Sequence, residues 1–455
     1  MCNHHSRSRL LLRFFVTMTL FISIINVYNF SSAQDLRSTH TFKEPTIRDP
    51  KLKAEKVMNG FNFPTGMAFL GPDDILIIEK NTGKVKEIKN GAIVRTILDV
   101  NVANDSERGL LGIAISKQPD KRDGNQSVHV FLYYTENKLK DGEDPNGPLG
   151  NRLYKYEYVD GKLISPKLLL DLPTIPGPSH NGGALKIGSD KQSVYLVIGN
   201  VNVVENETFN TKAQNNKNGP PPDGRGGVLR ITFDGGVVGK KGVLGNEAPL
   251  NKYYAYGIRN SFGIDFDPVT GNLWDTENGP EYGDEINLVE PGFNSGWNVV
   301  QGIWEPQDDL IKETDFVMGN ELLNPHNRLV DFGGKGKYSS PEFTWNDTVG
   351  PTGITFLSSD KLGKNYENDM FVGTTKGYLY HFDLNKKRSE LALDGTLSDK
   401  VANNGDELRR VSFARDFGLI TALEVGPDGC LYVLSGSRAT DEGAIYRIVP
   451  IKNHQ

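Results

Sequence analysis

One histidine lies in a setting that suits acid–base chemistry. His180 stands in the segment PSHNGGALKIG (residues 178–188), directly before an Asn-Gly-Gly turn. The glycines let other groups approach the imidazole ring closely. A neutral imidazole accepts protons near neutral pH because its unperturbed pKa lies there. Taken alone, the same pattern is also typical of a turn histidine that is hydrogen-bonded to the backbone.

Two further segments combine charged side chains with turn residues. Arg259 and Asn260 stand directly before an alternating run, where they would either bind an oxygen-rich ligand or tie neighbouring strands by hydrogen bonds. The segment NGPEYGDEIN (278–287) adds the adjacent carboxylates Asp284 and Glu285 to a Gly-Pro turn. Such hard oxygen donors suit a metal ion. The competing interpretation is a structural turn in which both carboxylates accept backbone amides.

The elements that must position these residues are short strands. A small residue, an alternating apolar run, a polar turn and a second strand form a unit that recurs six times. Glycine makes up 50 of the 455 residues, which suits many turns. Repeated small sheets with loops of varied length are typical of propellers, so the sequence predicts an all-β fold, a six-bladed β-propeller. The units begin at Gly66, Gly112, Gly183, Gly263, Gly353 and Thr421.

A propeller brings residues that are distant in sequence together. The first strand of each blade lines the central channel, so the residues just before these strands gather at one mouth. Glu107, His180, Arg259 and Asn260 all occupy such positions. The sequence therefore predicts that these four side chains meet. The last strand, AIYRIVP (444–450), is expected to close the ring by pairing with the first blade.

Four segments of the chain resemble one known family. Residues 254–298 match as a unit, and ERGLLGIAI (107–115), HNGGALKIG (180–188) and GPDGCLYVLSG (426–436) are shorter matches. On these segments the chain resembles the soluble glucose/sorbosone dehydrogenases, also called aldose sugar dehydrogenases. The resemblance implies pyrroloquinoline quinone (PQQ) and calcium as cofactors. It implies oxidation of an aldose at its anomeric carbon to a lactone, with PQQ as the hydride acceptor and calcium as a Lewis acid.

The resemblance also assigns roles to individual side chains. His180 would be the general base that takes the proton from the anomeric hydroxyl of the sugar. Arg259 and Asn260 would bind cofactor oxygens, because a planar guanidinium matches a carboxylate or an ortho-quinone edge. Glu107 would lie near substrate and cofactor. Lys376, in TTKGYLY, would bind the cofactor as well.

The same resemblance implies a calcium site in the Asn-Gly-Pro turn. Gly279 and Pro280 would offer backbone carbonyls to an ion beneath the cofactor, helped by the side chain of Asn278. The ion would act on the quinone as a Lewis acid. Asp284 and Glu285 would either hold this turn or bind a second calcium.

One strand departs from the family pattern. Leu419 and Thr421 stand where the family carries arginine that contacts a PQQ carboxylate. A leucine cannot pair with a carboxylate, and Arg409, Arg410 and Arg415 are the nearby candidates to replace the lost charge. Two alternatives therefore stay open beside the dehydrogenase. One is a non-catalytic propeller that binds a glycan or a partner protein, and the other is a metal-dependent lactonase.

The N-terminal segment has the layout of an export signal. Arginines precede an apolar run over residues 14–27, and small residues follow it. We expect residues 1–33 to be a signal peptide or an N-terminal anchor, and residues 34–54 to be a polar spacer. Residues 55–450 are expected to form the glucose/sorbosone dehydrogenase-like propeller. The body of the protein is then expected outside the cytoplasm, as a secreted or surface-anchored protein.

Net charge limits the expected binding partners, and cysteine content limits the expected disulfides. The formal net charge is −6 and no basic block stands out, so we expect no nucleic acid as partner. The expected partners are a small sugar substrate and an external electron acceptor, with membrane contact only through the N-terminal anchor. Cys430 is the one cysteine outside residues 1–33, so no intramolecular disulfide is expected in the propeller.

Overall fold

A computed structural model describes residues 44–119, 126–140, 142, 147–202, 210–303 and 328–451. They belong to one compact unit, Lys43–Gln455, and are mostly β-strand. The α-helix in this part of the chain is α1 (Gly405–Val411), which begins where the Asn404 side chain accepts the amides of Asp406 and Glu407. No helix among the described residues is long and apolar enough to cross a membrane. The expected signal or anchor, residues 1–33, lies outside the described residues.

The strands form six mainly antiparallel sheets, each named here by its innermost strand. The β3 sheet holds β3 (Pro64–Gly71), β4 (Asp74–Glu79), β5 (Lys84–Lys89) and β6 (Ala92–Asp99). The β7 sheet holds β7 (Leu110–Pro119), β8 (Gln126–Glu136), β9 (Gly150–Val159) and β10 (Lys162–Leu172). The β11 sheet holds β11 (Leu185–Ile187), β12 (Ser193–Ile198), β13 (Gly227–Thr232), β14 (Tyr253–Tyr256), β18 (Phe293–Asn294) and β19 (Lys337–Tyr338).

The second half of the chain supplies the other three sheets. The β15 sheet holds β15 (Ser261–Phe266), β16 (Leu273–Glu277), β17 (Tyr282–Val289), β20 (Phe343–Asp347) and β24 (Val401–Ala402). The β21 sheet holds β21 (Pro351–Phe356), β22 (Met370–Thr374), β23 (Leu379–Phe382), β25 (Ser412–Arg415) and β1 (Thr46–Ile47). The β26 sheet holds β26 (Leu419–Val425), β27 (Leu431–Gly436), β28 (Glu442–Pro450) and β2 (Leu52–Asn62).

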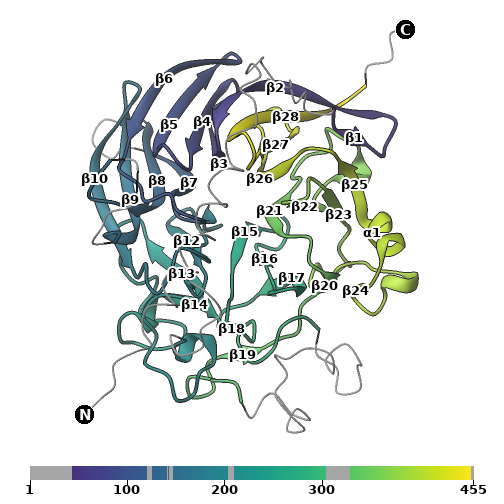
Figure 1. Cartoon of the computed structure of the whole chain (residues 1–455). Helices are drawn as coiled ribbons and strands as arrows, with labels where there is room; N and C mark the ends of the chain where they lie inside the picture. Colours follow the sequence, from purple (N-terminus) through teal and green to yellow (C-terminus); the bar gives the residue numbers. More distant parts are fainter. Residues whose placement is uncertain are drawn as a thin grey trace, which may run out of the picture. The chain divides into compact units, whose positions relative to one another are not determined.

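The sheets are arranged radially around a central axis (Figure 1). Their innermost strands contact one another in the order β3, β7, β11, β15, β21 and β26, and β26 contacts β3 again. Apolar side chains of neighbouring sheets pack into separate clusters between them, as where Trp274 and Trp345 are buried with β21 and β22. The expected all-β propeller architecture is confirmed.

The glycines of the repeat are explained by the lack of space between the innermost strands. A Cβ atom at Gly112 would lie 2.0 Å from the carbonyl oxygen of Gly183 in the next sheet. A Cβ atom at Gly263 would lie 2.1 Å from the carbonyl oxygen of Thr352. Backbones of neighbouring sheets thus touch at the axis, where no side chain fits. The six predicted starting positions all lie in, or just before, an innermost strand.

The ring is closed within the β26 sheet, where both ends of the described chain meet. β2 pairs antiparallel with β28, from Leu52 opposite Pro450 to Asn62 opposite Glu442. The expectation that the last strand pairs with the first blade is therefore corrected, because its partner is a strand that precedes that blade. The spacer expected over residues 34–54 is corrected at its C-terminal end. Residues 46–47 pair with β25, and β2 begins at Leu52, because these backbone groups complete sheet edges.

Substitution of Gly263 tests the close contact at the axis. We expect Gly263→Ala to destabilise the protein by about 1–3 kcal/mol, because the added methyl group meets a backbone oxygen that cannot turn away. The matched control is Gly71→Ala in β3, where the nearest atom to the added Cβ is 3.6 Å away. Urea unfolding measures both, and equal stabilities of the two variants would contradict the explanation.

Candidate active site

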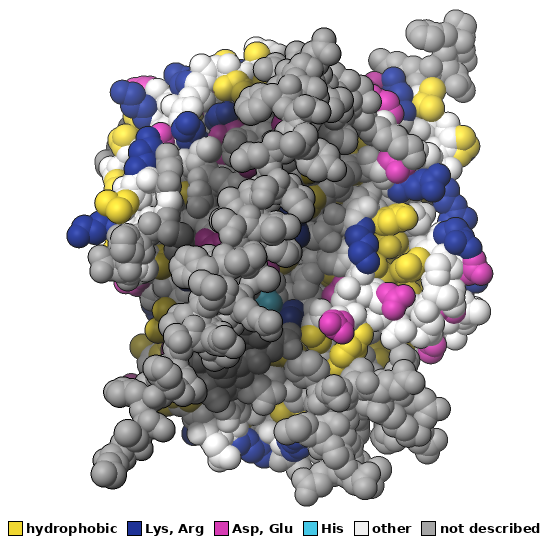
Figure 2. All heavy atoms as spheres, viewed as in Figure 1, with side chains coloured by type: hydrophobic (Ala, Val, Ile, Leu, Met, Phe, Trp, Pro, Cys, Tyr) yellow, Lys and Arg dark blue, Asp and Glu magenta, His cyan; other side chains and the backbone are white. Residues whose placement is uncertain are grey.

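A cavity of about 540 Å³ lies between the innermost strands of the propeller. Its wall includes the backbone of Gly112 and Gly263, and its polar lining at one end is formed by Lys80, Glu107 and Arg438. Figure 2 shows this face in the view of Figure 1, with histidine and basic side chains in the hollow near its middle. A volume of this size matches the pockets that hold small molecules and cofactors.

His180 is buried and tightly held next to residues of the cavity wall, which includes its hydrogen-bond partner Glu107 and the nearby Gly182 but not His180 itself. It precedes β11, its backbone has a φ of 61°, and its side chain is 8% exposed. The backbone N–H donates to Oε2 of Glu107 at 2.6 Å, and Nδ1 lies 2.6 Å from Oδ1 of Asn200. Because the amide oxygen accepts from Nδ1–H, the second ring nitrogen, Nε2, keeps its lone pair.

The surroundings of His180 keep its imidazole neutral. Burial, helped by the nearby charge of Arg259, lowers the pKa of His180 from 6.5 to about 4. The ring is therefore an acceptor at neutral pH, as a general base requires. The role of His180 as a general base stays a prediction.

Glu107 joins three of the predicted positions. Its Oε2 accepts from the His180 amide and, at 3.2 Å, from Nδ2 of Asn260. Glu107 precedes β7 and Asn260 precedes β15, so neighbouring sheets meet here as predicted. Burial raises the pKa of Glu107, opposed by these two hydrogen bonds.

Arg259 turns toward the Asn-Gly-Pro segment. Its Nη1 donates to the carbonyl oxygens of Asn278 at 3.0 Å and Gly279 at 2.9 Å, and the guanidinium lies 5.3 Å from the ring centre of Trp297. Its backbone N–H donates to Oε1 of Glu277 at 2.6 Å. Two carbonyl oxygens therefore converge on one cationic group. Carbonyl oxygens of this kind suit calcium, although the expected donors were the carbonyls of Gly279 and Pro280, and calcium binding by this turn stays a prediction.

Asp284 and Glu285 are fully buried and serve as acceptors within the fold. The carboxylate of Asp284 accepts the amides of Gly279 at 2.9 Å, Val349 at 2.7 Å and Gly350 at 2.8 Å. Oε1 of Glu285 accepts from Nε2 of Gln301 at 2.9 Å. These contacts match the turn-holding role, and metal binding by these two carboxylates stays a prediction. The side chain of Asn278 donates to the carbonyl oxygen of Pro351 at 2.9 Å, and Pro280 completes the turn.

Lys376 is the predicted cofactor residue that the structure places away from the others. It is exposed on the turn between β22 and β23, and its Nζ donates to the carbonyl oxygen of Thr348. Its neighbour Thr375 lines the cavity, whereas Lys376 does not. Cofactor binding by Lys376 stays a prediction.

Leu419 and Thr421 line the cavity, as the family pattern predicted for these positions. The three arginines considered as replacements lie elsewhere. Arg409 pairs with Asp406, Arg410 with Asp394 and Arg415 with Asp416, all at exposed positions. That expectation is wrong because these arginines belong to α1 and the outer strand β25.

Three cations that the sequence analysis missed line the cavity instead: Lys80, Arg438 and Lys186, of which Lys186 pairs with Glu424. Lys80 is 8% exposed, and its Nζ donates to Oδ1 of Asn81 and to the carbonyl oxygen of Asn104. Burial lowers the pKa of Lys80 to about 8. Arg438 lies close enough to affect the pKa values of both Lys80 and Glu107 by its charge. The cavity lining therefore combines three cationic side chains with the carboxylates of Glu107 and Glu424.

Comparison with known proteins agrees with this geometry. The model of the family described as glucose/sorbosone dehydrogenase matches residues 61–447. The chain belongs to the glucose/sorbosone dehydrogenase family. It is thus a sugar dehydrogenase-like enzyme.

Named relatives support the assignment. Quinoprotein glucose dehydrogenase B of Acinetobacter calcoaceticus is 32% identical over 260 residues, covering 54% of this chain and 52% of that protein. The aldose sugar dehydrogenase YliI of Escherichia coli K12 is 25% identical over 409 residues, covering 88% of this chain and 93% of that protein. A solved structure of a glucose dehydrogenase from Thermus thermophilus has a TM-score of 0.62 at 24% identity, covering 88% of this chain and all of that chain.

A glucose/sorbosone dehydrogenase fold also explains how the missed residues could have been found. The second strand of each sheet runs back to the mouth, so Pro64 lies opposite Glu79 and Leu419 opposite Gly436. Residues just after second strands therefore face residues just before first strands. This rule would have found the missed residues that follow β4, β12 and β27, namely Lys80, Asn200 and Arg438, and it also gives the predicted Asn278 after β16.

The pKa of His180 makes stability depend on pH. The imidazole of His180 binds a proton near pH 6.5 in the unfolded chain but only near pH 4 in the folded chain. The contribution of neutral His180 to the free energy of unfolding is therefore complete above pH 6.5 and is lost as the pH falls toward 4. We expect wild type to lose about 3 kcal/mol more than His180→Gln between pH 7 and pH 4. Urea unfolding at both pH values measures the difference. Parallel losses in the two proteins would show that His180 titrates normally.

Proposed function

We propose that the protein is an exported aldose dehydrogenase that oxidises the anomeric carbon of a sugar to a lactone, with PQQ and calcium as cofactors. The observation that carries this proposal is a neutral, buried His180 whose tautomer is fixed by Asn200, beside a cavity lined by cations. Relatives point the same way, since one is named a quinoprotein glucose dehydrogenase and a structural neighbour from Streptomyces coelicolor was solved in its PQQ-bound form. A six-bladed propeller is part of this proposal, and the six sheets support it.

In this proposal the side chains of the chain position the sugar and move its proton. Nε2 of His180 takes the proton from the anomeric hydroxyl while the hydride leaves the same carbon, which completes a two-electron oxidation. Glu107 holds the backbone of His180 in place and stands where it can accept a sugar hydroxyl. The buried setting excludes water and strengthens both interactions.

The residues around the cavity suit the two cofactors. When bound, PQQ supplies the two-electron acceptor and calcium polarises it. The carbonyl oxygens of Asn278 and Gly279 would hold the calcium ion, and Arg259 would turn its guanidinium to cofactor oxygens. Lys80 and Arg438 would pair with cofactor carboxylates in place of the arginines absent at Leu419 and Thr421.

Export and electron transfer complete the proposal. The basic and apolar pattern of residues 1–33 supports secretion or anchoring at the cell surface. The cavity opens to the surface, so a small external acceptor can reach a reduced cofactor. The product class, a lactone, follows from removal of hydride and proton at one anomeric carbon.

The first experiment titrates metal-free protein with PQQ, with and without calcium, and follows absorbance and then dye reduction with a panel of aldoses. We expect calcium-dependent binding at micromolar PQQ or below and sugar-driven dye reduction. His180→Gln should lower turnover by about 10²–10⁴-fold with unchanged PQQ affinity, because it removes only the base. Full turnover in that variant would remove His180 from the mechanism.

A separate titration tests the replacement cations. We expect Arg438→Ala to weaken PQQ binding about tenfold, equivalent to about 1.4 kcal/mol, because one charge-assisted contact is lost. Arg415→Ala is the matched control, since Arg415 is exposed on β25 and outside the cavity wall. Equal affinities for PQQ in the two variants would show that Arg438 does not contact the cofactor.

A propeller that binds a glycan or partner without catalysis is the second candidate, and the apolar side chain of Leu419 in the cavity wall favours it. Absence of PQQ binding in the first experiment would select this candidate. The lactonase alternative has less support, because the acidic residues among the described cavity lining are Glu107 and Glu424 only.

A further inference from the structure

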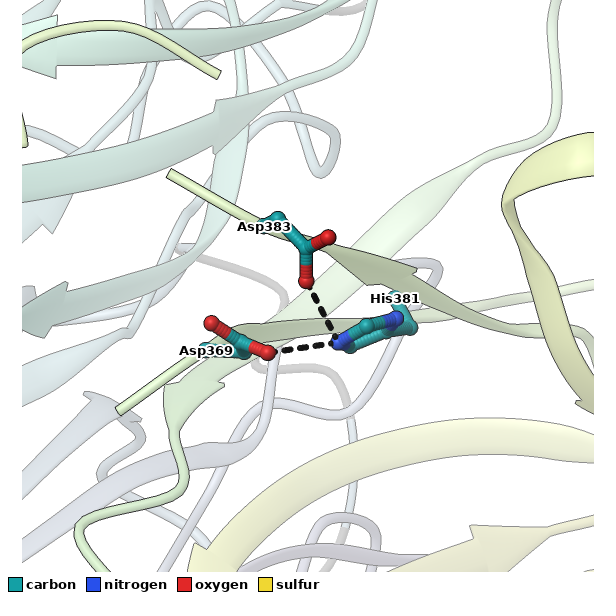
Figure 3. A group of neighbouring side chains, drawn as sticks. All are labelled: Asp369, His381 and Asp383. Atoms are coloured by element: carbon teal, nitrogen blue, oxygen red, sulfur yellow. Dashed lines mark hydrogen bonds and ion pairs between the residues drawn. The ribbon is translucent and has the colours of Figure 1, made fainter. Parts of the chain in front are cut away.

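A histidine and two aspartates converge at one end of the β22–β23 hairpin (Figure 3). Nε2 of His381 lies 3.0 Å from Oδ2 of Asp369 and 3.4 Å from Oδ1 of Asp383. One donor atom from each residue lies within 4.8 Å of the other two. The cluster is separate from the active site, because Asp369 precedes β22 whereas the cavity residue Thr375 follows it.

The protein groups alone do not balance this cluster. Nε2 of His381 carries at most one proton, so it can make a linear hydrogen bond to only one of the two carboxylates. Asp369 and Asp383 flank the paired residues Met370 and Phe382, which puts two like charges opposite each other across the hairpin. Like charges in this arrangement destabilise a sheet, and a divalent cation shared with His381 would offset the charge of both carboxylates.

The three side chains are held in place by different surroundings. The imidazole of His381 packs against Tyr366 at 5.2 Å and Phe371 at 5.1 Å between ring centres. The side chain of Asp369 is 13% exposed and that of His381 is 20% exposed, whereas that of Asp383 is 61% exposed. The inner two donors are thus fixed, and the outer one leaves a path for an ion and for water ligands.

We propose that Asp369, His381 and Asp383 form a binding site for a divalent metal ion of the zinc type. Ligand bonds of about 2.0–2.2 Å place the donor atoms of one ion about 3–3.5 Å apart, which matches the separations from Nε2. An imidazole combined with two carboxylates suits zinc or manganese, whereas calcium prefers oxygen donors alone. The ion would link β22 to β23 and neutralise the charges of Asp369 and Asp383.

Calorimetric titration of chelator-treated protein with zinc tests the proposal. Calcium is present in excess so that the carbonyl site near Arg259 does not compete. We expect one equivalent of zinc to bind wild type, and that equivalent to be lost in Asp383→Asn and in His381→Gln. His129→Gln is the matched control, because His129 lies on β8, outside the cluster, and it should retain zinc binding.

Thermal unfolding separates a metal site from an ion pair. Without metal, Asp383→Asn should be at least as stable as wild type, because the variant removes one of two facing charges. With zinc, the melting temperature of wild type should rise and that of Asp383→Asn should not. Equal zinc binding in wild type and all three variants, or no binding to wild type at millimolar zinc, would overturn the proposal and leave a His381–Asp369 ion pair.

Discussion

Contact between backbones at the central axis is the constraint on which the rest of the structure depends. Innermost strands of neighbouring sheets approach so closely that Gly112 and Gly263 have no room for a Cβ atom. The cavity lies between the same strands, and Gly112 and Gly263 form part of its wall. Glycine at these positions therefore allows the close packing of the ring and also shapes the cavity at its centre. Chemistry can then be supplied by the loops, which meet at the end of the cavity.

The site itself shows how burial and charge are combined. Glu107 accepts the amide of His180 and the side chain of Asn260, so one carboxylate links three neighbouring sheets. Arg259 lowers the proton affinity of the same histidine and also fixes the carbonyls of Asn278 and Gly279. Positioning and protonation state are thus set by the same few groups. A change to one of these side chains alters the geometry and the electrostatics of the site together.

Much of the fold and part of the site could be predicted from the sequence. Alternation and glycine spacing located the innermost strands, because the period of a strand and the crowding at the axis both act locally on residue type. The expectation that residues just before the first strand of each blade meet was correct for Glu107, His180 and Asn260. Lys376 lies on an exposed turn apart from these three residues, because the sequence pattern places a turn without fixing the direction of its side chains. Lys80 and Arg438 were missed because their positions depend on second strands, whose register with the first is set by pairing that no single segment reveals.

Pairing of β2 with β28 has a consequence for how the chain becomes a protein. The β26 sheet needs residues from both ends of the propeller, so five sheets can form while the sixth still lacks its inner three strands. Until β28 pairs with β2, the backbone groups of β2 lack their strand partners and the ring of sheets is not closed. Because synthesis proceeds from the N-terminus, the last strand must be complete before the ring of sheets can close. A chain interrupted before residue 442 would keep most of its strands and still lack a closed pocket.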